Sequence, residues 1–261
     1  LLLLSAAVVS PQAAAAQTIP ACDPNAPVQV VSIGVDGQPV HSTTDANIST
    51  DSRYVAFLQI IRLEGYFPTE TAMLLRDRLT CQTEVVSISP TGTAFTNVVG
   101  KPYVSADGRY VVFRVQPSPG APYVVYQRDR LLGVTTHLSI LPSGADMRCS
   151  FALDMSADGR YVLLDSYDSD NCSASTPQSR QLYLRDTLLN MTELVTVTSN
   201  NQPRSLASTS TSVASGAVSD DGRYVFFDSP DSDLILGDTN VYIDIFMRDR
   251  LLQYTKLITK S

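Results

Sequence analysis

Four segments of the chain repeat the same order of polar and apolar residues. Each has an apolar residue, a Ser-x-Asp turn that ends in Gly or Ser, and an Arg-Tyr-Val strand. The copies are ISTDSRYVAF at 48–57, VSADGRYVVF at 104–113, MSADGRYVLL at 155–164 and VSDDGRYVFF at 218–227. Turn residues followed by β-branched and aromatic residues predict a strand, a tight turn and a second strand. The second strand is apolar on both faces, so we expect it to be covered on both sides.

A second motif alternates with the first and predicts another turn. An apolar strand ends in Arg-Asp and leads into a short final strand. The copies are LLRDRLT at 74–80, YQRDRLL at 126–132, YLRDTLL at 183–189 and FMRDRLL at 246–252. The repeating unit therefore has four antiparallel strands, A to D in chain order, and a period of roughly 50 to 60 residues, typical of a repeat array such as a propeller.

These eight ordered motifs resemble the TolB-type, WD40-like β-propeller repeat. The resemblance covers residues 28–261 and implies an all-β fold, a β-propeller of four-stranded antiparallel blades. The blades are expected at about 40–90, 91–141, 142–198 and 199–261. The first copy has Ser52 where the others have glycine, so we expect a different turn type there.

The chain enters this array on a strand that belongs to no complete blade. Residues 28–39 match residues 194–203, which form a D strand, but no A, B or C strand precedes them. The last unit supplies its own D strand near residues 256–259. We therefore expect four blades plus one leading strand, with an incomplete ring and further blades in the full protein. The alternative is a closed four-bladed ring with one surplus strand.

The blade geometry predicts that eight charged residues have a structural role. Strand B starts where antiparallel strand C ends, so the first Arg of strand B can meet the last Asp of strand C. The expected pairs are Arg53 with Asp77, Arg109 with Asp129, Arg160 with Asp186 and Arg223 with Asp249.

The N-terminal segment and the cysteines indicate an exported protein. Residues 1–16 resemble the end of a secretory signal peptide, with an apolar run and small residues before the cleavage point, and residues 17–27 form a linker. We therefore expect a periplasmic or secreted protein, in which disulfides can form. Cys149 and Cys172 flank one repeat copy, which favours a bond between them and a second between Cys22 and Cys81; four unpaired buried thiols are the alternative.

Charge and motif content exclude several function classes. The net charge is -7 and no basic run is present, which argues against a nucleic-acid partner. No later segment is long and apolar enough for a transmembrane helix. The sequence has two histidines, His41 and His137, and lacks G-x-S-x-G, H-E-x-x-H, C-x-x-C and nucleotide-binding motifs. We therefore expect no catalytic residues in this segment.

Candidate binding residues fall in the variable B–C and D–A loops, which share one face of a propeller. The aromatic and acidic candidates are Tyr66, Phe67, Tyr123, Tyr167, Asp168, Asp170, Asp231 and Asp233. The aromatic rings would suit a peptide or sugar, or else pack under the loops. Asp238, Asn240 and Asp244 offer oxygen ligands for calcium. The alternative is that these acidic loops hold no cofactor and that their carboxylates cap turns and solvate the loops.

The resemblance and the absence of catalytic motifs together predict an exported, non-catalytic binding module for a protein, peptide or envelope polysaccharide. Three alternatives stay open. The segment could be the propeller portion of a larger hydrolase such as a peptidase, a metal-dependent polysaccharide lyase, or a purely structural repeat that binds no ligand.

Overall fold

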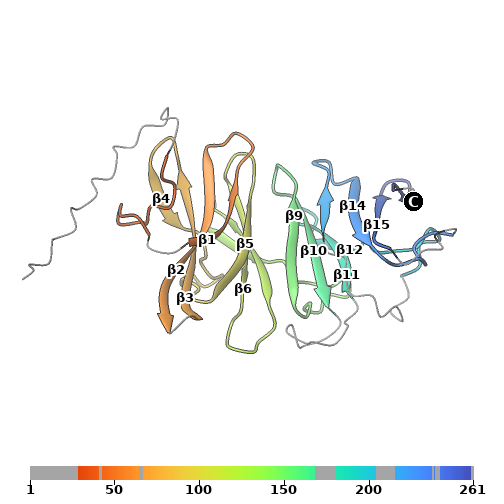
Figure 1. The fold of residues 1–261 in the computed structure, drawn as a ribbon, viewed down its shortest axis with the longest axis horizontal. Helices are drawn as coiled ribbons and strands as arrows, with labels where there is room; N and C mark the ends of the chain where they lie inside the picture. The colour runs from red at the N-terminus through yellow and green to blue at the C-terminus, as the bar shows by residue number, and fades with distance from the viewer. Residues whose placement is uncertain are drawn as a thin grey trace, which may run out of the picture.

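A computed structural model describes residues 29–40, 43–64, 67–167, 180–203, 215–236, 238 and 242–259. Within these ranges the chain forms sixteen strands and no helix, so the all-β prediction is confirmed (Figure 1). The strands make four antiparallel sheets of four strands each, in chain order. Among the described residues no helix is long and apolar enough to cross a membrane.

Each sheet is one blade with strands A to D. Blade 1 comprises β1 (Thr43–Ile48), β2 (Tyr54–Glu64), β3 (Phe67–Asp77) and β4 (Gln82–Val85). Blade 2 comprises β5 (Val98–Val104), β6 (Tyr110–Val115), β7 (Val124–Asp129) and β8 (Val134–His137). Blade 3 comprises β9 (Ser150–Met155), β10 (Tyr161–Tyr167), β11 (Arg180–Asp186) and β12 (Met191–Leu194). Blade 4 comprises β13 (Gly216–Val218), β14 (Tyr224–Ser229), β15 (Asp244–Asp249) and β16 (Tyr254–Leu257).

The hydrophobic core lies between consecutive blades. Ala56 and Met73 of blade 1 pack with Val111 and Phe113 of blade 2. The next two junctions are built in the same way, by Val112 against Val162 and Leu164, and by Leu163 and Leu182 against Val225 and Phe227. Strand B is therefore covered on both faces in blades 2 and 3, as its two apolar faces predict.

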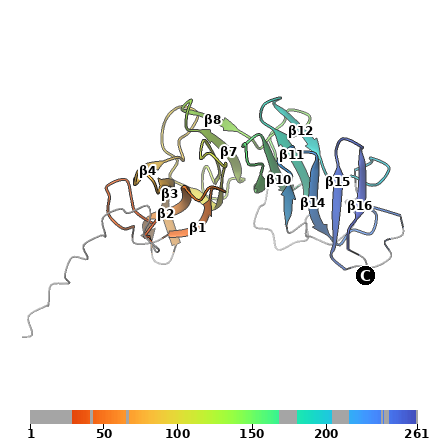
Figure 2. The same cartoon turned by 90° about the horizontal axis from the view of Figure 1, so that it is seen from above.

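The blades follow one another along an arc. Figures 1 and 2 show blade 1 at one end of the molecule and blade 4 at the other. The sheets do not close into a ring, so within the described residues the expected incomplete ring is confirmed and a closed four-bladed ring is excluded.

The leading segment behaves as the end of a D strand. Its Ile33 bridges Pro39 in a tight hairpin, and the same bridge follows β4, β8 and β12. Val31 and Val40 pack against Val55 and Phe57 of blade 1. The segment therefore covers the face of blade 1 that a preceding blade would cover.

Ser52 does not change the turn type, contrary to the prediction from sequence. Its φ is 61°, close to the φ of 71° at Gly108, and both residues donate their backbone N–H to the serine carbonyl that starts the turn. A left-handed φ at a non-glycine residue costs about 1 kcal/mol, which this turn tolerates. Ser52 is exposed, whereas Gly108, Gly159 and Gly222 are buried against the preceding blade.

Blade 4 has an uncovered face at the far end of the arc. Phe226 and Ile245 are 39% and 44% exposed. The residues at the same repeat positions in blade 3, Leu163 and Leu182, are fully buried. Leu163 and Leu182 are buried because blade 4 packs on this face of blade 3.

Candidate functional site

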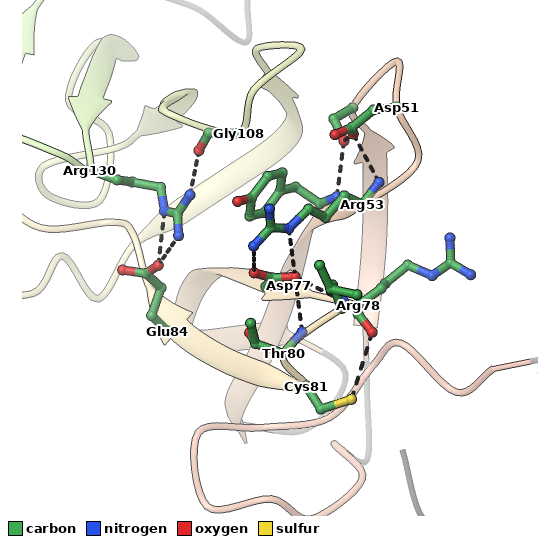
Figure 3. Close-up of polar contacts among 12 residues, drawn as sticks. Asp51, Arg53, Asp77, Arg78, Thr80, Cys81, Glu84, Gly108 and Arg130 are labelled. Carbon is green, nitrogen blue, oxygen red and sulfur yellow. Dashed lines mark hydrogen bonds and ion pairs between the residues drawn. The ribbon is translucent and has the colours of Figure 1, made fainter. Parts of the chain in front are cut away.

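The repeated Arg and Asp residues lie together at the A–B and C–D turns of every blade. The Nη2 atoms of Arg53, Arg109, Arg160 and Arg223 lie 2.7, 2.7, 2.7 and 2.8 Å from Oδ2 of Asp77, Asp129, Asp186 and Asp249. Asp77 also accepts hydrogen bonds from the backbone N–H groups of Leu79 and Thr80. Figure 3 shows Asp77 with Arg53 and Thr80. The hydrogen bonds from Arg53 lower the pKa of Asp77 to about 2. These residues hold the A–B and C–D turns of each blade together.

A third residue of the Arg-Asp motif joins consecutive blades, which the sequence analysis did not anticipate. Arg130 donates from Nη1 to the carbonyl of Gly108 at 2.5 Å and from Nε to Glu84 of the preceding blade at 2.8 Å (Figure 3). Arg250 makes the same two contacts, with Gly222 at 2.5 Å and with Glu193 at 2.9 Å. The missed indication in the sequence is a side-chain oxygen acceptor in the preceding D strand, Gln29, Glu84 or Glu193, wherever the next unit reads Arg-Asp-Arg.

The predicted loop face is described only in part. Tyr66, Asp168, Asp170 and Asn240 lie outside the described residues. Phe67 begins β3, a C strand, opposite Glu64. Tyr167 ends β10, a B strand, opposite Arg180. Both residues therefore belong to strands rather than to loops.

The acidic loop of blade 4 contains buried carboxylates. The alternative to a calcium site predicted solvated carboxylates there. Asp231 is buried and accepts a 2.7 Å hydrogen bond from the Ser229 hydroxyl, and buried Asp244 accepts one of 2.6 Å from Thr259. Asp238 is also buried, whereas Asp233 is exposed. Among the described residues no three acidic, His or Cys side chains are placed to hold a metal. Because Asn240 lies outside this set, calcium binding stays a prediction.

The cysteine pairing also stays a prediction. Cys149 is fully buried, and no described cysteine is a free thiol. The expected partners, Cys22 and Cys172, lie outside the described residues.

One predicted residue, Tyr123, contacts Arg114, which lines a pocket between blades 2 and 3 at the loop end of the strands. The guanidinium carbon of Arg114 lies 4.7 Å from the centre of the Tyr123 ring and 4.3 Å from that of Phe151. The two rings meet edge to face, with centroids 5.6 Å apart. Arg114 is thereby fixed by cation–π contacts.

Two further cations complete this pocket. Lys101, Arg114, Phe151 and Arg180 line a hollow of about 170 Å³. Arg180 forms an ion pair with the fully buried Asp165, and burial lowers the pKa of Arg180. Three cationic side chains around one aromatic wall can receive an anionic group, above all a carboxylate, which an arginine binds in a planar arrangement.

The pocket depends on substitutions within the repeat that the sequence analysis did not single out. Arg114 occupies the strand-B position that holds Leu58, Asp165 and Asp228 in the other blades. Lys101 comes from β5 of the same blade, whereas Phe151 and Arg180 come from β9 and β11 of blade 3, which packs on blade 2. A single cation at a repeat position that otherwise holds Leu or Asp is the indication that would have found it.

Comparison with known proteins supports the fold. No family model matches the chain, and no curated protein matches it. Among solved structures, TolB from Acinetobacter baumannii aligns with 84% of this chain and 44% of its own, at 16% identity and a TM-score of 0.50. The β-propeller domain of the Trilobed protease from Pyrococcus furiosus aligns with 83% of this chain and 57% of its own, at 10% identity and a TM-score of 0.50.

A peptidase propeller is similar to the same extent. The Pyrococcus horikoshii acylaminoacyl peptidase aligns with 84% of this chain and 32% of its own, at 14% identity and a TM-score of 0.52. The chain thus spans less than two thirds of each of these structures. At such identities the likeness concerns fold alone, and it confirms that the four blades belong to a β-propeller similar to those of TolB and of peptidase propeller domains.

Proposed function

We propose that the protein is an exported, non-catalytic binding propeller of the periplasm or the extracellular space. Its ligand is a carboxylate-bearing segment of a protein, peptide or envelope polysaccharide, held on the face of the B–C and D–A loops. The observation that carries this proposal is Arg114, whose guanidinium lies against the rings of both Tyr123 and Phe151 and beside Lys101 and Arg180. A planar guanidinium can bind a carboxylate through two parallel N–H donors.

The electrostatics of the pocket favour a small acidic group over a neutral one. The chain as a whole carries a net charge of -7, so a cluster of three cations stands out against its background. Asp165 forms an ion pair with one of these cations, Arg180. The aromatic walls add apolar contact for a sugar ring or a side chain next to the carboxylate.

A binding titration tests this function. The probes are a short glutamate-containing peptide and an oligosaccharide of uronic acids, each compared with its neutral amide counterpart. We expect Arg114→Gln to weaken binding of the acidic probes at least about tenfold, as the loss of a charge-assisted hydrogen bond implies. Arg62→Gln is the matched control, because Arg62 is an exposed arginine that pairs with Glu70 on blade 1. Equal affinity of Arg114→Gln and the wild type would contradict the proposal.

A hydrolase role is the second candidate, and the fold likeness to acylaminoacyl peptidase is the observation that favours it. In that case this segment would guide a substrate to a catalytic domain elsewhere in the same polypeptide. Sequencing the surrounding coding region tests this candidate, because a G-x-S-x-G element outside the propeller would supply the nucleophile.

A metal-dependent lyase would lose activity on uronic-acid polymers when a chelator is added.

A further inference from the structure

The A–B and C–D turns form the opposite face of the propeller, and one of its three blade junctions is open. At the first and third junctions, Arg130 and Arg250 bridge to an acid of the preceding blade. At the second junction the same two positions are Thr136, the third residue of β8, and Thr187, which follows Asp186. A groove of about 410 Å³ lies between blades 2 and 3 at this point.

The two closed junctions show which group fits such a groove. The guanidinium carbon of Arg130 lies 5.1 Å from the ring centre of Tyr54, and that of Arg250 lies 5.6 Å from the ring centre of Tyr161. Tyr110 is the equivalent ring at the second junction and lines the groove. Thr187 stands where the other blades have arginine, so this position places no cation over the Tyr110 ring. The chain therefore builds the same tyrosine wall three times and supplies its own arginine only twice.

Acceptor atoms surround the open position. In the closed junctions the arginine donates to the carbonyl of the turn glycine. The equivalent carbonyl of Gly159 accepts a 2.6 Å hydrogen bond from Gln127 Nε2, and a carbonyl oxygen has a second lone pair. Asp158 is exposed on the groove wall, where its carboxylate accepts hydrogen bonds from the Ser156 hydroxyl and the Arg160 backbone N–H. The Arg160 side chain also lines the groove and is paired with Asp186.

The rim of the groove is apolar and exposed. Leu132 and Leu188 line it with 67% and 72% of their surface accessible, and Val134 is 50% exposed. The turn does not require leucine for its shape, because the Asp129 carboxylate holds the backbone N–H groups of the two residues after Arg130. Exposed leucines on both sides of a groove indicate a surface that contacts another molecule.

We propose that this groove binds an arginine side chain of a partner polypeptide, with the apolar neighbours of that arginine packed on Leu132 and Leu188. The guanidinium takes the place that Arg130 and Arg250 occupy at the other junctions, over Tyr110 and beside Asp158. The acidic net charge of the chain favours a basic partner. This site is independent of the proposed function, because it lies on the opposite face.

A peptide titration tests the site. The probe is Ac-Leu-Arg-Leu-NH₂, followed by the amide chemical shifts of Tyr110 and Thr187, and its control contains citrulline, the uncharged analogue of arginine. We expect saturable binding of the arginine peptide and at least about tenfold weaker binding of the citrulline peptide. Equal binding of the two peptides, or no binding of the arginine peptide, would overturn the proposal.

Two paired variants separate this site from a non-specific contact. Thr136→Glu with Thr187→Arg restores the internal bridge and should abolish binding, while the free energy of unfolding stays the same or increases. Glu193→Thr with Arg250→Thr should open a second groove and raise the stoichiometry from one peptide to two. If the first variant is folded and still binds, or if the second is folded and binds only one peptide, the assignment is wrong. Arg114→Gln should leave both results unchanged, so the two faces are tested separately.

Discussion

Gly108 lies directly against the ring of Tyr54 from the preceding blade. A Cβ on Gly108 would stand 2.2 Å from Cδ2 of that ring, well inside contact distance. Gly159 and Gly222 meet Tyr110 and Tyr161 in the same way. The turn glycine thus serves two purposes, since it adopts a φ of 71° and also makes room for the neighbouring blade.

This relationship predicts different costs for two glycine substitutions. Gly108→Ala should lower the free energy of unfolding by about 2 to 4 kcal/mol, about 1 from the left-handed backbone and the rest from overpacking against Tyr54. Gly144→Ala is the control, because Gly144 has a φ of 86° and nothing within 4 Å of its added Cβ. Only the backbone cost of about 1 kcal/mol should remain there. Urea denaturation measures both, and equal costs would show that the tyrosine contact does not matter.

The Arg–Asp pair of each blade predicts a graded loss of stability. Asp129 accepts hydrogen bonds from Arg109 and from the backbone N–H groups of Leu131 and Leu132. Asp129→Ala removes all of them and should cost about 1 to 3 kcal/mol. Asp129→Asn keeps an acceptor oxygen for the turn and should cost less. Urea denaturation of both variants provides the test, and wild-type stability of Asp129→Ala would argue against a structural role for the pair.

The fold could be predicted because its determinants recur within each unit. Four copies of two motifs define strands, turns and the Arg–Asp pairs through contacts inside one blade. The Gly108–Tyr54 contact and the Arg130–Glu84 bridge run between blades, and sequence periodicity does not show which residues meet there. For the same reason the turn at Ser52 was predicted wrongly, since glycine is required by the neighbouring ring as much as by φ.

From the sequence, only the face of the propeller that carries the candidate site could be predicted, and not the residues that form it. Tyr123 was placed on the correct loop end, but its stacking partner Arg114 is a strand residue, and Phe151 and Arg180 come from the next blade. Such a site needs the packing of two blades, which composition and spacing do not encode. Asp231 was a candidate residue of the binding face, with a solvated, turn-capping carboxylate as the alternative, and it is buried and hydrogen-bonded to Ser229.

The lowered pKa of the paired aspartates predicts acid sensitivity. Hydrogen bonds from their arginine partners lower the pKa of Asp129 and Asp249, and bring that of Asp77 to about 2, below the usual value of about 3.9. A carboxyl with a depressed pKa in the folded state stabilises the protein above the unfolded pKa and loses this contribution as the pH falls toward the folded pKa. Stability should therefore decline between about pH 4 and pH 2.

Thermal unfolding from pH 7 to pH 2 measures this decline. Asp77→Asn should be less stable than the wild type at pH 7, and its melting temperature should approach that of the wild type in acid. Burial raises the pKa of Asp154, which acts in the opposite direction, so Asp154→Asn should steepen the net acid loss. A constant difference between Asp77→Asn and the wild type at all pH values would contradict the assignment.

The uncovered face of blade 4 predicts that equivalent apolar residues differ in their contribution to stability. Leu163→Ala should cost about 2 to 5 kcal/mol, because this side chain is fully buried between blades 3 and 4. Phe226→Ala, at the same repeat position, should cost about 1 kcal/mol or less, because Phe226 is 39% exposed and no described blade packs upon it. Urea denaturation of this 261-residue chain compares the two. If Phe226→Ala costs as much as Leu163→Ala, another molecule or another copy of the chain covers that face in solution, and dilution should then reduce the cost.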